Sequence, residues 1–124
     1  MAKIRLLIHG VTGRMGQESL SALCENNNIV IVGGVCKQNR TNLLTLPDGS
    51  GEIALYTDIV EAIETTKPDV VLDFSNAGAS IHAGIETLGR GIYYVTGTSG
   101  LTDIDIEQMD RISTSNGVGV IIAP

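Results

Sequence analysis

Short apolar runs alternate along this chain with longer stretches that have the spacing of helices. The runs are rich in β-branched residues, which favour strands, and they fall at residues 4–8, 29–35, 54–56, 70–74, 93–96 and 118–123. The helix-like stretches are 15–25, 59–65, 77–88 and 104–115. Strands that alternate with helices typically build a parallel sheet covered by helices. We therefore predict an α/β fold, a doubly wound and mostly parallel sheet with helices on both faces.

Length and composition limit the function classes. The 124 residues suit one domain, and 43% hydrophobic with 18% charged residues argues against disorder. A net charge of -6 with scattered bases argues against nucleic-acid binding. No apolar run approaches the roughly 20 residues of a membrane span, and the start of the chain lacks a signal-peptide core. We therefore expect a cytoplasmic protein with no membrane partner.

Two further local interpretations concern the cysteines and one polar stretch. Cys24 and Cys36 lack the spacing of metal ligands, so we expect two free thiols and no metal site. Residues 37–52 are polar and include Pro47, so we expect a loop there. Asp58 and Thr102 have the positions of helix caps.

A glycine-rich segment, residues 10–16, follows the first predicted strand and opens the first helix. Glycine here lets the chain turn sharply, lets its backbone approach a pyrophosphate and lets the helix pack close to the sheet. The helix N-terminus adds unpaired N–H groups and partial positive charge. The spacing is GxxGxxG, with Thr12 at the middle glycine of the common GxGxxG pattern. The segment indicates a Rossmann-like dinucleotide-binding turn, and the alternative is a tight turn without a ligand.

Basic side chains near this turn have two interpretations each. Arg14 either binds phosphate oxygens at the start of the helix or extends into solvent. After the second predicted strand, where the common pattern has a carboxylate for the adenosine ribose, the chain has Cys36, Lys37 and Arg40. Lys37 and Arg40 either neutralise a 2′-phosphate, which favours NADP(H) over NAD(H), or are ordinary loop bases.

Polar segments at residues 73–76 and 97–100 follow two later predicted strands. Because ligands bind outside the carboxyl ends of strands in open α/β sheets, we expect both segments to face the crevice of the glycine turn. Asp73 is either a general base or, as we favour, an acceptor of structural hydrogen bonds from neighbouring backbone N–H groups. His9 and His82 have no acid-and-nucleophile pattern beside them, so we expect packed or solvated side chains.

Three segments resemble the dihydrodipicolinate reductases of bacterial lysine and diaminopimelate biosynthesis. They are GVTGRMG at 10–16, VVLDFSNA at 70–77 and YVTGTSGL at 94–101. The closing IIAP at 121–124 resembles the start of a family segment that continues Asn-Phe-Ser. The resemblance covers essentially the whole chain as the cofactor half of that enzyme. It implies that residues 1–124 form a dinucleotide-binding domain.

The resemblance also implies which residues form the site. The residues expected to cradle the pyrophosphate are Gly10, Thr12, Gly13, Arg14, Met15 and Gly16. Those expected along the cofactor cleft and near the nicotinamide are Phe74, Ser75, Gly97, Thr98 and Ala123, and Thr98 is also expected to touch substrate. Cys36 stands where several family members place an acidic ribose ligand. We therefore expect NADP(H) to bind as well as NAD(H) or better.

The family's substrate-binding segment, with its His-His pair and lysine, and its tetramer-forming sheet lie beyond the region that this chain resembles. We therefore expect either a part of a longer homotetrameric protein or a lone nucleotide-binding half. By itself the chain is expected to be a monomer or weak dimer, without catalytic residues and inactive. The leading hypothesis is the NAD(P)H-binding domain of a reductase acting on dihydrodipicolinate. The alternatives are a non-catalytic NAD(P)-binding sensor or regulatory module, and the cofactor half of another amino-acid-pathway dehydrogenase.

Overall fold

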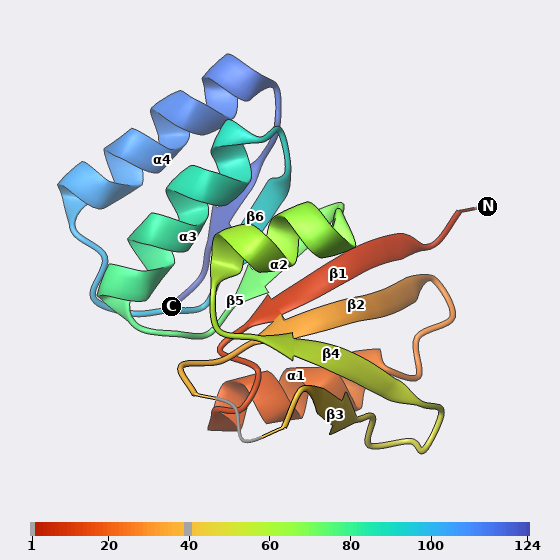
Figure 1. Ribbon diagram of the computed structural model, residues 1–124. Coiled ribbons are helices and arrows are strands. Elements are labelled where there is room, and N and C mark those ends of the chain that lie inside the picture. The colour runs from red at the N-terminus through yellow and green to blue at the C-terminus, as the bar shows by residue number, and fades with distance from the viewer. Residues whose placement is uncertain (1, 39–40) are drawn as a thin grey trace.

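A computed structural model of the chain describes residues 2–38 and 41–124. Within them, seven strands form one sheet in the order β3-β4-β2-β1-β5-β6-β7 (Figure 1). The strands are β1 (Ile4–His9), β2 (Ile29–Val35), β3 (Leu43–Thr45), β4 (Glu52–Tyr56), β5 (Val70–Asp73), β6 (Tyr93–Thr96) and β7 (Val120–Ile122). The helices are α1 (Arg14–Leu23), α2 (Ile59–Thr66), α3 (Ala77–Gly89) and α4 (Asp103–Asn116). All strand pairings are parallel except β3 with β4, which confirms the predicted Rossmann-like fold.

The sheet separates two layers of core. Figure 1 shows α2, α3 and α4 on one face of the sheet and α1 on the other. Because side chains alternate along a strand, Leu7 of β1 packs in the core beneath α2–α4, whereas Leu6 and Ile8 pack with Leu20 of α1. The same alternation puts His9, at the end of β1, on the face of Leu7.

The stretch 37–52 is not a continuous loop, and the sequence interpretation of it was wrong. Leu43–Thr45 forms β3, which pairs antiparallel with β4, and Leu44 lies opposite Ile53. Ile53 is buried and Leu44 is partly buried beside it in the core on the α1 face. A three-residue edge strand between polar segments is stabilised by this pairing, which local sequence does not reveal.

Side-chain caps mark the starts of α2, α3 and α4. Asp58 accepts a hydrogen bond from the N–H of Val60, and Thr102 forms a capping box with Asp105, so both predicted caps are confirmed. Asn76 caps α3 by accepting from the N–H of Ala79. In the described part of the chain, no helix combines the length and the apolar character needed to cross a membrane.

Candidate functional site

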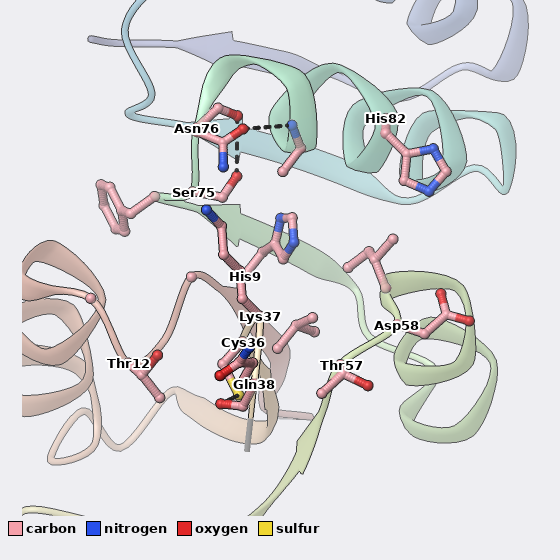
Figure 2. Close-up of a pocket in the computed structure, with 16 residues that line it drawn as sticks. His9, Thr12, Cys36, Lys37, Gln38, Thr57, Asp58, Ser75, Asn76 and His82 are labelled. Atoms are coloured by element: carbon pink, nitrogen blue, oxygen red, sulfur yellow. Dashed lines mark hydrogen bonds between the residues drawn. The ribbon is translucent and has the colours of Figure 1, made fainter. Parts of the chain in front are cut away.

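A cleft of about 800 Å³ opens at the carboxyl ends of β1, β2, β4 and β5 (Figure 2). Sheet order reverses beside it, because the chain runs from β1 to β2 on one side and later returns to β5 on the other. This reversal is the place where open α/β sheets bind ligands. The predicted cofactor-binding residues that line the cleft are Gly10, Thr12, Gly13, Cys36, Lys37, Phe74 and Ser75.

Two glycines of the turn are required by the fold. Gly10 has a φ of +78°, and a Cβ there would lie 2.8 Å from the carbonyl carbon and oxygen of Phe74. A Cβ on Gly16 would lie 2.1 Å from the carbonyl oxygen of Gly10. These contacts bring the β5–α3 connection and the first turn of α1 against the end of β1.

Gly13 differs from both, because the nearest atom to a Cβ there would be the Gly10 carbonyl oxygen at 3.4 Å. Gly13 is the N-cap of α1, has extended backbone and makes no side-chain capping hydrogen bond. The first N–H groups of a helix have no partner within the helix, and they attract anions. Gly13 therefore leaves room for a ligand beside these donors.

Arg14 and Met15 are not among the residues that line the cleft. The Arg14 side chain is 91% exposed, and its Nε lies 3.7 Å from Glu18 Oε1. Met15 is half exposed. Neither side chain lines the cleft, so a contact of either with phosphate remains a prediction. Arg40 lies outside the described residues.

Asp73 is a fully buried carboxylate at the end of β5. It accepts hydrogen bonds from the N–H and hydroxyl of Ser75, at 3.1 and 2.6 Å. The hydroxyls of Thr96 and Thr98 lie 2.7 and 2.8 Å from its Oδ2, and Nδ1 of His9 lies 2.9 Å from its Oδ1. The expected backbone hydrogen bond is present, and three of the other four donors are side chains of β1, of β6 and of the segment after β6.

The donors around Asp73 keep its carboxylate ionised. Burial acts to raise the pKa of Asp73, but hydrogen bonds from His9, Ser75 and Thr96 outweigh it and hold the pKa well below its usual range. Ser80 of α3 extends the network, since its Oγ lies 3.1 Å from the Thr96 hydroxyl and 3.0 Å from the Tyr94 hydroxyl. The network joins the ends of β1, β5 and β6 to α3.

The residues expected near the nicotinamide lie together beyond Asp73, outside the lining of the cleft. Gly97 faces the ring of Phe74, where a Cβ would lie 2.5 Å from a ring carbon. The hydroxyl of Thr98 donates to Asp73, and its side chain is buried. The N–H of Ala123 donates to the carbonyl of Thr96. Their contacts with cofactor, and that of Thr98 with substrate, stay predictions.

Sequence reasoning missed part of the lining, chiefly residues that follow β2 and β4. These residues are Gln38, Thr57 and Asp58, together with Ala79 of α3, and the two histidines His9 and His82 also face the cleft (Figure 2). Asn76 lines the cleft as expected for the segment 73–76. The rule that ligands bind after strand ends applies to residues 57–58 as well as to 73–76. Among the described lining residues, Asp58 carries the only carboxylate.

Comparison with known proteins adds an independent observation. Residues 4–124 match the family model described as dihydrodipicolinate reductase, N-terminus. The chain belongs to the dihydrodipicolinate reductase family. It is 38% identical to the 4-hydroxy-tetrahydrodipicolinate reductase of Dehalococcoides mccartyi, over 100% of this chain and 47% of that protein. It is 30% identical to that of Bacillus subtilis, over 98% of this chain and 46% of that protein.

Solved structures agree with this membership in the dihydrodipicolinate reductase family. A dipicolinate-bound dihydrodipicolinate reductase from Paenisporosarcina sp. TG-14 superposes with a TM-score of 0.84 at 30% identity, covering 98% of this chain and 47% of that one. Homoserine dehydrogenase from S. aureus gives 0.82 at 16% identity, over 98% and 33%, which shows the shared fold alone. The family resemblance predicted from the sequence is confirmed, and the chain spans about half the length of the curated relatives it matches.

Proposed function

We propose that this chain binds a nicotinamide dinucleotide in the cleft, as the cofactor-binding part of a reductase that acts on dihydrodipicolinate. The observation that carries the proposal is the family match over residues 4–124, together with a cleft at the glycine turn. By the same relationship we infer a place in lysine and diaminopimelate biosynthesis. We also infer that the whole enzyme is a cytoplasmic homotetramer.

The residues of the cleft suit a dinucleotide. Its volume lies within the range of small-molecule sites, and Gly13 leaves space where a side chain would block a pyrophosphate. The start of α1 supplies N–H donors, and Lys37 supplies positive charge. Gly10, Thr12 and Gly13 would hold the pyrophosphate, while Phe74 and Ser75 border the path toward β6. The bound cofactor supplies the hydride, and the chain binds and orients it.

We further propose that NADP(H) binds as well as NAD(H) or better. The end of β2 carries Cys36, whose thiol donates to the carbonyl of Gln38 at 3.3 Å, in place of a carboxylate. Burial raises the pKa of the Cys36 thiol, so the side chain is neutral near pH 7 and does not repel a 2′-phosphate. Lys37 follows directly and lines the cleft. These features favour the phosphorylated cofactor.

The proton donor and most substrate contacts belong, in this proposal, to the part of the relatives that the chain does not span. Asp58, the only acid among the described lining residues, caps α2, and Asp73 is committed to hydrogen bonds within the protein. Hydride transfer needs the cofactor and the proton donor held around one substrate. The chain therefore contributes the cofactor and its orientation.

Titration of the ¹⁵N-labelled chain with NADPH, followed by NMR, tests the proposal. We expect saturable shifts at Gly10, Thr12, Gly13 and Ser75, with little change at Gly49 in the β3–β4 connection. Shifts spread evenly over the chain, or none at millimolar NADPH, would reject dinucleotide binding in this cleft.

A further inference from the structure

His9 lies where β1 meets β5, and it pairs with Asp73 in the sheet register. Its side chain is 11% exposed, and it lines the cleft (Figure 2). The next residue is Gly10, whose positive φ begins the glycine turn. The imidazole is therefore held at the switch point of the sheet, beside the segment proposed to hold the pyrophosphate.

Asp73 determines which ring nitrogen of His9 carries a proton. An ionised carboxylate only accepts hydrogen bonds, so Nδ1 of His9 must donate to Oδ1 across their 2.9 Å separation. Asp73 in turn is held by Ser75, Thr96 and Thr98. The ring is thus oriented by a buried network, and Nε2 is left as the nitrogen that is free to meet a ligand.

Lys37 and the N-terminus of α1 favour an anion in this cleft. Lys37 after β2 and His82 on α3 line the same cleft as His9, and Asp58 before α2 adds one carboxylate. Asp58 already accepts from the N–H of Val60 at the start of α2. Cys36 adds no charge near neutral pH, because burial raises its pKa. A protonated His9 would add its Nε2–H, beside Lys37, as a donor to phosphate oxygens, and Asp73 would balance its charge.

We propose that His9, oriented by Asp73, binds a phosphoryl oxygen of the dinucleotide through Nε2–H, so that dinucleotide binding takes up a proton. The inference rests on the proposed function, because it assigns a new contact in the same cleft. A neutral imidazole with Nδ1 protonated presents a lone pair at Nε2, and only the imidazolium donates there. Because only the protonated ring donates from Nε2, the contact makes affinity depend on pH.

Calorimetric titration with NAD in buffers of different ionisation enthalpy measures the proton uptake directly. NAD is the probe because a 2′-phosphate titrates near pH 6 by itself. If the protonated form binds about tenfold more tightly, as one charge-assisted hydrogen bond allows, uptake between pH 6 and 9 peaks at about half a proton. The dissociation constant then rises by up to about tenfold from pH 6 to pH 9.

Two variants test whether His9 is the group that takes up the proton. Asparagine at position 9 carries an N–H that can still donate to Asp73 but does not titrate, so His9→Asn should abolish uptake and weaken NAD binding at pH 6. His82→Asn makes the same change on the opposite wall and should keep the uptake. Binding by the wild-type chain with no uptake, or uptake that survives His9→Asn, would overturn the inference while leaving the proposed function intact. Absence of NAD binding at every pH would contradict the proposed function itself.

Discussion

The hydroxyl of Thr98 lies 2.8 Å from Oδ2 of Asp73 and donates a hydrogen bond to it. This contact ties the segment after β6 to the end of β5, where the Phe74 ring also lies against Gly97. The segment after β5 borders the proposed cofactor site, and a buried carboxylate holds it against the segment after β6. The hydrogen bonds to ionised Asp73 therefore help to organise the site before a ligand binds.

Replacing Asp73 with asparagine should destabilise the fold by about 3 kcal/mol at pH 7, because buried donors lose a charged acceptor. The pKa of Asp73 in the folded chain lies below its unfolded value, which is about 4. The stabilisation is therefore present above about pH 4 and is lost as the pH falls through the folded pKa. Urea unfolding of wild type and Asp73→Asn should show a stability difference that shrinks below about pH 4.

Asp48 supplies the matched control. It accepts from the N–H and hydroxyl of Ser50, as Asp73 does from Ser75, but it lies exposed in the β3–β4 connection. Asp48→Asn should change the unfolding curve little at any pH. An equal loss in both variants would show that burial and the extra donors around Asp73 contribute nothing.

Gly13→Val should abolish dinucleotide binding in a folded domain. The Cβ position at Gly13 has no backbone atom closer than 3.4 Å, so the added side chain would occupy ligand space without distorting the turn. Circular dichroism melting should show a loss of about 1 kcal/mol, from the poorer N-cap. Binding of NADPH, followed by its fluorescence, should be undetectable.

Gly16→Ala should destabilise the fold more than Gly13→Val does. Its Cβ would lie 2.1 Å from the Gly10 carbonyl oxygen, so α1 must move and the fold should lose about 2 kcal/mol or more. Unchanged NADPH binding in a folded Gly13→Val variant would remove the glycine turn from the site. Equal melting temperatures for the Gly13 and Gly16 variants would contradict the close packing of α1.

Replacing both Lys37 and Arg40 with alanine should weaken NADP binding about tenfold and change NAD binding little. A charge-assisted phosphate contact contributes about 1.5–3 kcal/mol, and an exposed side chain contributes less. The difference should shrink with added salt. Lys3→Ala, which precedes the amino end of β1 and so lies away from the cleft at the carboxyl ends, is the control and should affect neither cofactor. Equal losses of NAD and NADP affinity would show that Lys37 and Arg40 do not bind the 2′-phosphate.

The sequence predicted those features whose cause is local. Alternating runs predicted the main strands, and Asp58 and Thr102 predicted two helix starts, because capping depends on the next few residues. The sequence did not predict β3, because its three residues are stabilised by pairing with β4. An edge strand of that length has no periodicity to detect.

In the candidate site, too, the sequence predicted local features and missed contacts between distant residues. The glycine turn and the Asp73–Ser75 contact are local and were predicted, whereas the pairing of His9 with Asp73 joins residues 64 positions apart. That pairing depends on β1 and β5 being neighbours in register, which the order of residues along the chain does not reveal. Thr96 and Thr98 likewise reach Asp73 only because β6 lies beside β5.

Calorimetric titration of NADP and NAD against the chain measures directly whether its cleft binds a dinucleotide. We expect saturable binding of both cofactors with one site per chain, and an NADP dissociation constant equal to or lower than that of NAD. Gly13→Val should give no heat of binding under the same conditions. No binding of either cofactor at millimolar concentration to the folded wild-type chain would contradict a dinucleotide site in this cleft.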